Sequence, residues 1–230
     1  MTSAIDDNAS AREAMLGRVR AALGKTDDRT AAAASALAYV AARPQGPRPT
    51  LPGDLVERFI QRATDMESTV ERIASLALLP HAVARYVDGL DLPPALAEQK
   101  SMQGVCWPEF EALDWEGAGL AIEPRPTHGR DRLGITGTFC AIAETGTLLI
   151  TSGAATPTAT MLLPDTHVAV VRPGRIVAGM EDAFALVRAE RPGMPRAMNF
   201  VSGPSRTGDI EQTIVVGAHG PFRVHIIVVG

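Results

Sequence analysis

The chain has 230 residues, of which 46% are hydrophobic and 21% are charged, and these values are typical of a globular protein. A net charge of -4 and an aromatic content of 4% argue against nucleic acid as the main partner. The opening residues lack the basic and apolar regions of a secretory signal, and no apolar run reaches the roughly 18 residues of a membrane span. We therefore expect a cytoplasmic protein without a membrane segment.

Two proline-poor stretches at the start of the chain have helical patterns, at residues 10–23 and, within an alanine-rich run, at 27–42. A stretch with four prolines follows and is typical of a linker. We therefore divide the chain into an N-terminal helical segment (1–42), a Pro-rich linker (43–53) and a main domain (54–230). A short tethered helix of this kind is typical of a packing arm or of a contact within a homo-oligomer.

The first part of the main domain is predicted to be helical. An apolar stripe capped by Asp54 predicts a helix over 54–75, and a shorter helix is predicted over 79–87. Three aromatic residues then lie close together in the sequence: Trp107, Phe110 and Trp115. They could form a packed corner of the core or a surface that stacks on a ligand, and aromatic side chains are chiefly core material.

From Gly117 onward, short apolar runs alternate with helical patterns. The predicted strands lie at 139–143, 147–151, 167–171 and 224–229, and the predicted helices lie at 156–163 and 179–189. The first two strands are separated by Glu144-Thr-Gly146, which predicts a β-hairpin. Nearly continuous apolar strands between helices indicate an α/β domain in which helices cover both faces of the sheet.

The two cysteines, Cys106 and Cys140, do not form a CxxC pair. Two thiols cannot by themselves hold a four-cysteine iron–sulfur cluster or a closed zinc site. We therefore expect this chain to bind no metal or other cofactor.

The stretch Ser202–Glu211 concentrates polar chemistry. It follows an apolar run and predicts a strand, a stiff glycine-rich turn, and then either a helix or a second extended run. Arg206 offers a planar fork of donors that suits a carboxylate or a phosphate, and turn N–H groups could assist it. Alternatively, Arg206 pairs with Asp209 or Glu211 and only stiffens the loop.

Three further ionisable residues are candidates for a site. Glu144 lies at the predicted hairpin tip, where an acid is either solvated or able to act as a base or nucleophile. His167 opens a strand, and His219 lies between glycines that allow a ligand to approach the backbone. Each histidine taken singly is more often structural, because a lone histidine carries no spacing signal.

Four blocks of the sequence together resemble the signature of the lactate-utilization (LUD) domain family. They are Ala141–Thr147, Leu162–Val171, Gly203–Glu211 and Gly217–Pro221. The helix around residues 11–23 is similar to the usual opening of that family. The resemblance is strongest from about Gly134 to the end of the chain, so that the main domain is expected to be a LUD domain.

The resemblance implies the fold shared by sugar-phosphate isomerases and CoA transferases, in which a central, mostly parallel sheet is flanked by helices. It also implies a role in the oxidation of L-lactate to pyruvate alongside two iron–sulfur partner proteins, which would carry the clusters. The positions that match the family motifs are Glu144, Thr145, Gly146, His167, Gly203, Ser205, Arg206, Thr207, Asp209, Glu211 and His219.

These residues support three hypotheses. In the first, the chain is a small-carboxylate-binding subunit of an oxidoreductase assembly, in which Arg206 binds the carboxylate and Glu144 or His219 accepts the proton of the hydroxyl. In the second, it is a stand-alone acyl-transfer or sugar-phosphate enzyme, in which Glu144 accepts the acyl group. In the third, it is a scaffold that stabilises its cluster-bearing partners without chemistry of its own.

Overall fold

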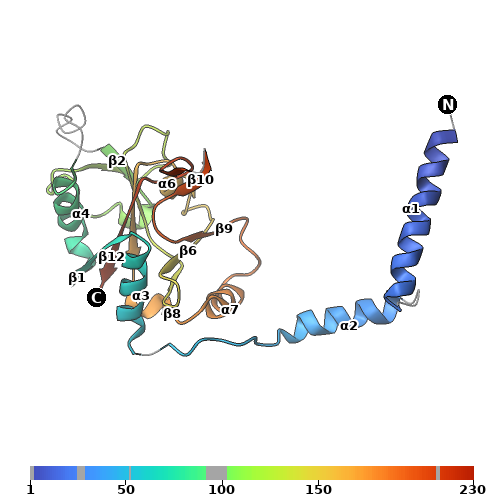
Figure 1. Cartoon of the computed structure of the whole chain (residues 1–230). Coiled ribbons are helices and arrows are strands. Elements are labelled where there is room, and N and C mark those ends of the chain that lie inside the picture. The colour runs from blue at the N-terminus through green and yellow to red at the C-terminus, as the bar shows by residue number, and fades with distance from the viewer. Residues whose placement is uncertain (1–2, 25–28, 52, 92–102, 211–212) are drawn as a thin grey trace. The chain divides into compact units, whose positions relative to one another are not determined.

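The chain consists of two units, residues 1–50 and 51–230, which are described separately below. The computed structural model describes residues 3–24, 29–51, 53–91, 103–210 and 213–230. The first unit contains helices α1 (Ser3–Ala22) and α2 (Arg29–Ala42), so that helices form over both stretches whose patterns predict them (Figure 1). Helix α1 begins earlier than predicted, and the predicted start of the second helix at residue 27 lies outside the described residues.

The core of the second unit is a six-stranded sheet in which all described neighbours are parallel. In spatial order its strands are β1 (Thr69–Ile73), β12 (Arg223–Val229), β7 (Thr166–Val171), β4 (Leu133–Thr136), β2 (Gln103–Cys106) and β3 (Ala121–Glu123). The predicted α/β class with a parallel central sheet is therefore confirmed.

Both faces of this sheet are buried, as the uninterrupted apolar strands predict. In β7, Val168 and Val170 belong to one core cluster, whereas Ala169 and Val171 belong to another, because successive side chains of a strand point to opposite faces. Helix α4 (Leu79–Asp88) contributes to the first cluster and helix α3 (Leu55–Asp65) to the second, so that each packs against a different face (Figure 1).

The prediction of one helix over 54–75 is wrong after residue 65. Helix α3 begins as predicted, since the Asp54 carboxylate accepts hydrogen bonds from the backbone N–H groups of residues 56 and 57 at 2.6 and 3.2 Å. The helix ends at Asp65, and Glu67 adopts a left-handed φ of 64°. The next residues form β1, whose register runs from Thr69 opposite His225 to Ile73 opposite Val229. Pairing with a long buried strand thus overrides the local helical pattern.

Two smaller sheets and the helices α6 (Ala159–Leu162) and α7 (Met180–Glu190) make up much of the remaining described part of the second unit. A four-stranded sheet consists of β8 (Ile176–Val177), β5 (Cys140–Ile142), β6 (Thr147–Thr151) and β9 (Met198–Val201). A two-stranded hairpin consists of β10 (Arg206–Ile210) and β11 (Thr213–Val216). Strands β5 and β6 are antiparallel, which confirms the predicted hairpin around Glu144.

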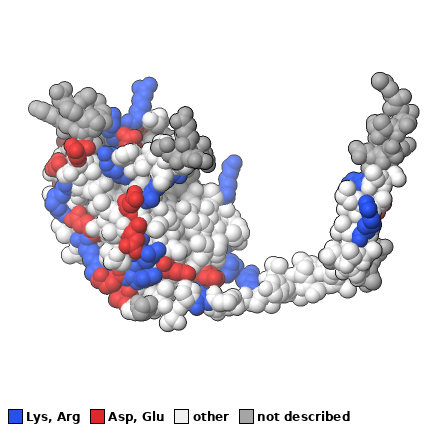
Figure 2. All heavy atoms as spheres, in the orientation of Figure 1, with Lys and Arg blue, Asp and Glu red and all other residues white. Residues whose placement is uncertain are grey.

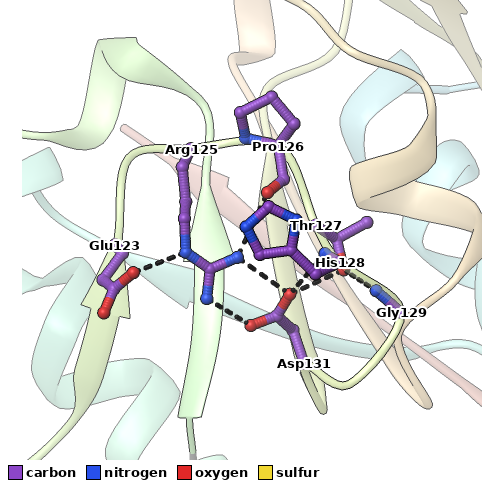
Figure 3. A network of polar contacts seen from close by, with 7 residues as sticks. All are labelled: Glu123, Arg125, Pro126, Thr127, His128, Gly129 and Asp131. Atoms are coloured by element: carbon purple, nitrogen blue, oxygen red, sulfur yellow. Dashed lines mark hydrogen bonds and ion pairs between the residues drawn. The ribbon is translucent and has the colours of Figure 1, made fainter.

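The connection between β3 and β4 is fixed by a network around the Asp131 carboxylate, whose side chain is 5% exposed (Figure 3). Arg125 donates two hydrogen bonds to it, at 2.8 and 3.1 Å, and the Thr127 hydroxyl donates a third at 2.7 Å. The hydrogen bond from Arg125 is the main cause that lowers the pKa of Asp131 to about 2. The carboxylate is therefore charged at neutral pH and holds the loop immediately before β4.

Charged side chains of both signs are interspersed on the drawn face of the second unit (Figure 2). The ion pairs of the second unit include Arg72–Glu57 at 2.7 Å and Arg62–Asp65 at 2.7 Å. Among the described residues, no helix combines the length and the apolar character that crossing a membrane requires.

Candidate functional site

A cavity of about 450 Å³ lies at the carboxyl ends of three neighbouring strands of the main sheet, and we call it the sheet-end cavity. Its lining includes Trp107 directly after β2, Gly137 directly after β4 and Arg172 directly after β7. The remaining wall includes residues at the end of β6 and at the end of α7. Its size is within the range of small-molecule sites in proteins.

The sheet-end cavity also lies where the strand order of the sheet reverses. The chain adds β3 on one side of β2, then returns to the other side of β2 and adds β4, β7 and β12 in that direction. The crevice between β2 and β4 is thus a topological switch point, and open α/β sheets bind their ligands at the carboxyl ends of strands at such points. Its position alone makes this cavity the leading candidate for a ligand site.

The wall of the cavity carries three arginines, of which Arg175 is the most firmly held. This residue belongs to the 3₁₀ turn Pro173–Arg175 that follows β7. Its guanidinium binds both carboxylate oxygens of Glu190 at 2.6 and 2.9 Å, and its Nε donates to the backbone oxygen of Phe139 at 2.9 Å. These three hydrogen bonds hold the end of α7 at the cavity and use most of the donor capacity of Arg175.

The other two arginines are less engaged. Arg191 donates from Nη2 to the Thr151 hydroxyl at 3.0 Å and lies over the Phe139 ring at 5.0 Å. Arg172 is 61% exposed, and its Nη2 lies 3.8 Å from the Glu109 carboxylate, which is beyond hydrogen-bond distance. An incoming anion can therefore bind Arg172 without breaking a hydrogen bond to Glu109, whereas the other two arginines already donate hydrogen bonds to other residues.

Glu109 is the acid that faces Arg172. It lies in the 3₁₀ turn Pro108–Phe110, close after the end of β2. Its carboxylate packs against Gly137, where a Cβ would lie only 2.1 Å from Oε1. Burial raises the pKa of Glu109 above its ordinary value, against the opposing effects of Arg172 and of a hydrogen bond from the Gly137 backbone. A carboxyl with a raised pKa in a cleft is a common feature of functional sites.

Several of the sequence-predicted residues meet at a different place, which we call the loop cluster: residues 145–147, 202–206 and 217–221 with the end of α3. The Thr145 hydroxyl lies 2.7 Å from that of Thr147, which lies 2.6 Å from that of Ser202. Gly146 and Gly203 both have positive φ angles and pack directly against the backbone of α3 and Met66. These two glycines therefore allow the loops to approach the helix end closely.

Arg206 begins β10 and takes part in the same cluster. Its Nη2 lies 3.0 Å from the Glu67 carboxylate and donates to the backbone oxygen of Met66 at 3.2 Å. Ser205 links the strand to the later loop, because its backbone oxygen accepts from Gly217 N–H at 2.8 Å and its N–H donates to the Pro221 oxygen at 3.0 Å. Arg206 thus has a structural ion-pair partner in Glu67, which the sequence did not indicate.

The remaining predicted residues differ in their burial. Glu144 is half-buried at the hairpin tip, and His219 is exposed in the 217–221 loop. His167 is fully buried within β7, and its Nε2 lies 2.8 Å from the Thr136 hydroxyl. Thr207 is buried in β10, the side chain of Asp209 is not described, and Glu211 lies outside the described residues.

A second cavity, of about 600 Å³, borders the loop cluster. It is lined by Glu67, Pro204 and Phe222, and by residues at the starts of β1 and β12. It therefore opens at the amino ends of strands, which is the edge that α/β sheets rarely use for ligands.

Sequence reasoning missed the residues of the sheet-end cavity. The position of Arg172 in the sequence could have indicated the site, because this residue directly follows the predicted buried strand 167–171. Residues that follow such strands lie together at one edge of a parallel sheet. Trp107 and Phe110, predicted as either a packed corner or a stacking surface, are buried and contribute to the cavity wall. Within the described part of the chain, no group of three His, Cys, Asp or Glu side chains could hold a metal ion.

The fold and the cavity define an α/β protein whose candidate ligand site lies at the carboxyl edge of a parallel sheet. Residues 119–229 match the LUD domain family model. The chain is 34% identical over 198 residues to lactate utilization protein C of Deinococcus radiodurans, a match that covers 80% of this chain and 89% of that protein. The chain therefore belongs to the LUD-domain family of lactate utilization protein C.

Other relatives match over a shorter span. Lactate utilization protein C of Bacillus subtilis is 33% identical over 134 residues, which is 56% of each chain. Lactate utilization protein C of Bacillus licheniformis is 33% identical over 127 residues, and this match spans 53% of that protein, or about half of its length. A crystal structure of a DUF162 family protein from Deinococcus radiodurans has a TM-score of 0.53 and 27% identity, and covers 79% of this chain and 100% of that one.

Proposed function

We propose that this chain is a subunit of a lactate-utilization system and that it binds a small carboxylate such as L-lactate in the sheet-end cavity. The names of its relatives support the system, and the arginines of the cavity wall support the ligand class. The observation that carries the proposal is the position of Arg172, exposed at the carboxyl edge of the sheet with only a loose contact to Glu109.

The chemistry of the wall favours an anion over a neutral ligand. Arg175 and Glu190 neutralise each other, so that Arg172 and Arg191 face a single remaining acid, Glu109. A guanidinium binds a carboxylate through two parallel N–H donors, which fixes the orientation of the ligand as well as its charge. A hydroxy acid could also use the Thr151 and Thr156 hydroxyls at the edge of the cavity.

The electrons of lactate oxidation would leave through partner proteins. Oxidation of lactate to pyruvate releases an electron pair, which needs an acceptor. The two thiols of this chain are buried, and burial raises the pKa of Cys106 to about 12 and that of Cys140 to about 11. Metal clusters are bound by thiolates, which such an environment disfavours. Iron–sulfur partner subunits are therefore the acceptors that we propose.

Arg172→Gln is expected to weaken L-lactate binding at least about tenfold, because a charge-assisted hydrogen bond contributes roughly 1.5–3 kcal/mol. Calorimetric titration of the full chain measures this directly. Arg132→Gln is the matched control, since Arg132 precedes β4 at the opposite edge of the sheet and pairs with Asp165 at 3.2 Å. Arg206→Lys distinguishes the two regions: a loss of binding in this variant alone would place the anion in the loop cluster and contradict the sheet-end cavity.

The purified chain alone is expected to give no lactate-dependent electron transfer, and activity should appear when the iron–sulfur partners are added. The assay follows reduction of an artificial acceptor by L-lactate. Arg172→Gln should lower the reconstituted rate in parallel with its loss of affinity. An unchanged rate with this variant would favour the scaffold hypothesis, and activity of the chain alone would contradict the need for partners.

A further inference from the structure

We propose that the sheet-end cavity takes up its anion together with a proton, and that the Glu109 carboxylate receives this proton. The inference rests on the proposed function, because it concerns the same cavity, and it adds a specific role for a residue beside the anion. The role follows from three features of the wall. They are the position of Glu109, its long separation from Arg172, and the hydrogen bonds that Arg175 and Arg191 make to other residues.

Glu109 lies in the 3₁₀ turn after β2, and its carboxylate packs against Gly137. A Cβ at residue 137 would lie 2.1 Å from Oε1, so that the carboxylate occupies space that only a glycine leaves open. Its side chain is nevertheless 42% exposed, so that solvent and a ligand can both reach it. The carboxylate therefore faces the interior of the cavity and remains accessible for proton exchange.

Arg172 is a counter-ion of Glu109, because its positive charge lowers the pKa of that carboxyl and so favours the ionised form. The two groups are 3.8 Å apart, too far for a hydrogen bond, and Arg172 has no other ion-pair partner among the described residues. An incoming carboxylate that binds Arg172 takes this counter-ion from Glu109 and places a second negative charge beside it. Both changes favour the protonated form of Glu109.

The two other arginines of the cavity wall have partners of their own. Arg175 is bound to Glu190 through two hydrogen bonds, and Arg191 donates to the Thr151 hydroxyl. Glu111 directly follows the turn that carries Glu109 and is not among the residues that line the cavity. Burial already raises the pKa of Glu109, and the loss of Arg172 as its counter-ion raises it further. Anion binding and proton uptake are thereby coupled.

The coupling predicts how affinity depends on pH. L-lactate should bind more weakly as the pH rises through the range in which Glu109 titrates, by up to about tenfold per pH unit, the limit for one linked proton. Glu109→Gln keeps the size and the hydrogen-bonding shape of the side chain but cannot titrate. This variant should bind L-lactate with an affinity that is nearly independent of pH over the same range.

The experiment is calorimetric titration of the full chain with L-lactate in two buffers of different ionisation enthalpy, which measures the protons taken up on binding. The expected result is net uptake by the unmodified chain and by Glu111→Gln, the matched control, and none by Glu109→Gln. Binding without proton uptake, or uptake that persists in Glu109→Gln, overturns this inference alone. Absence of L-lactate binding to the unmodified chain overturns the proposed function and this inference with it.

Discussion

Gly146→Ala is expected to lower the free energy of unfolding of the second unit by about 3 kcal/mol, from the combined costs of overpacking and of a strained backbone. Gly146 has a φ of 69°, and a Cβ there would lie 2.3 Å from the backbone nitrogen of Ala63 in α3. Neither the hairpin tip nor the helix can move without disturbing the buried residues on both sides of it. Urea denaturation monitored by circular dichroism measures the change.

Two further alanine variants separate the causes. Gly119 has a φ of 77° with no heavy atom near its added Cβ, so that Gly119→Ala reports the backbone cost alone, about 1 kcal/mol. Gly193 has neither a positive φ nor a close neighbour, and Gly193→Ala should be nearly neutral. If Gly146→Ala cost no more than Gly119→Ala, the close packing of the hairpin tip on α3 would be contradicted.

The second large effect is a loss of stability as the pH falls from about 6.5 to about 4. Burial lowers the pKa of His167 to about 4, and it also lowers that of His225 to about 4. In this window the unfolded chain binds protons that the folded chain excludes, so that each histidine adds a slope of about 1.4 kcal/mol per pH unit. The free energy of unfolding therefore keeps this contribution above about pH 6.5 and loses it as the pH falls towards 4.

Urea denaturation at a series of pH values measures this slope. His167→Gln should reduce the slope by up to about 1.4 kcal/mol per pH unit, whatever its effect on stability at neutral pH, because it removes one of the histidines that the fold holds neutral. His81→Gln is the control, since His81 is exposed on α4 and should leave the slope unchanged. An unchanged slope in His167→Gln would show that this histidine is not held neutral in the fold.

Much of the fold was predictable because its signals are local. The hairpin around Glu144 and the strands now seen as β7 and β12 were indicated by short apolar runs with glycine or proline at their ends. The segment 69–73 was not predictable in the same way. Its pattern suits a helix, and it becomes a strand only because β12 offers it a parallel partner 156 residues later in the chain, as the contact between Thr69 and His225 shows.

The same distinction between local and long-range signals applies to the residues of the candidate sites. The polar loop around Arg206 stands out in the sequence because its residues are contiguous, yet its ion pair is with Glu67, which comes from the end of α3. Glu109, Arg172 and Arg191 carry no motif spacing, because they come from three separate elements. They become neighbours only when parallel strands bring their carboxyl ends to one edge.

The sequence by itself determined the α/β class, the parallel core and the resemblance to the LUD family, because periodicity and contiguous blocks are properties of the chain. The tertiary structure alone decided where a ligand site is formed. The order in which β2, β3 and β4 enter the sheet creates the switch point, and strand order depends on long-range pairing rather than on any local pattern.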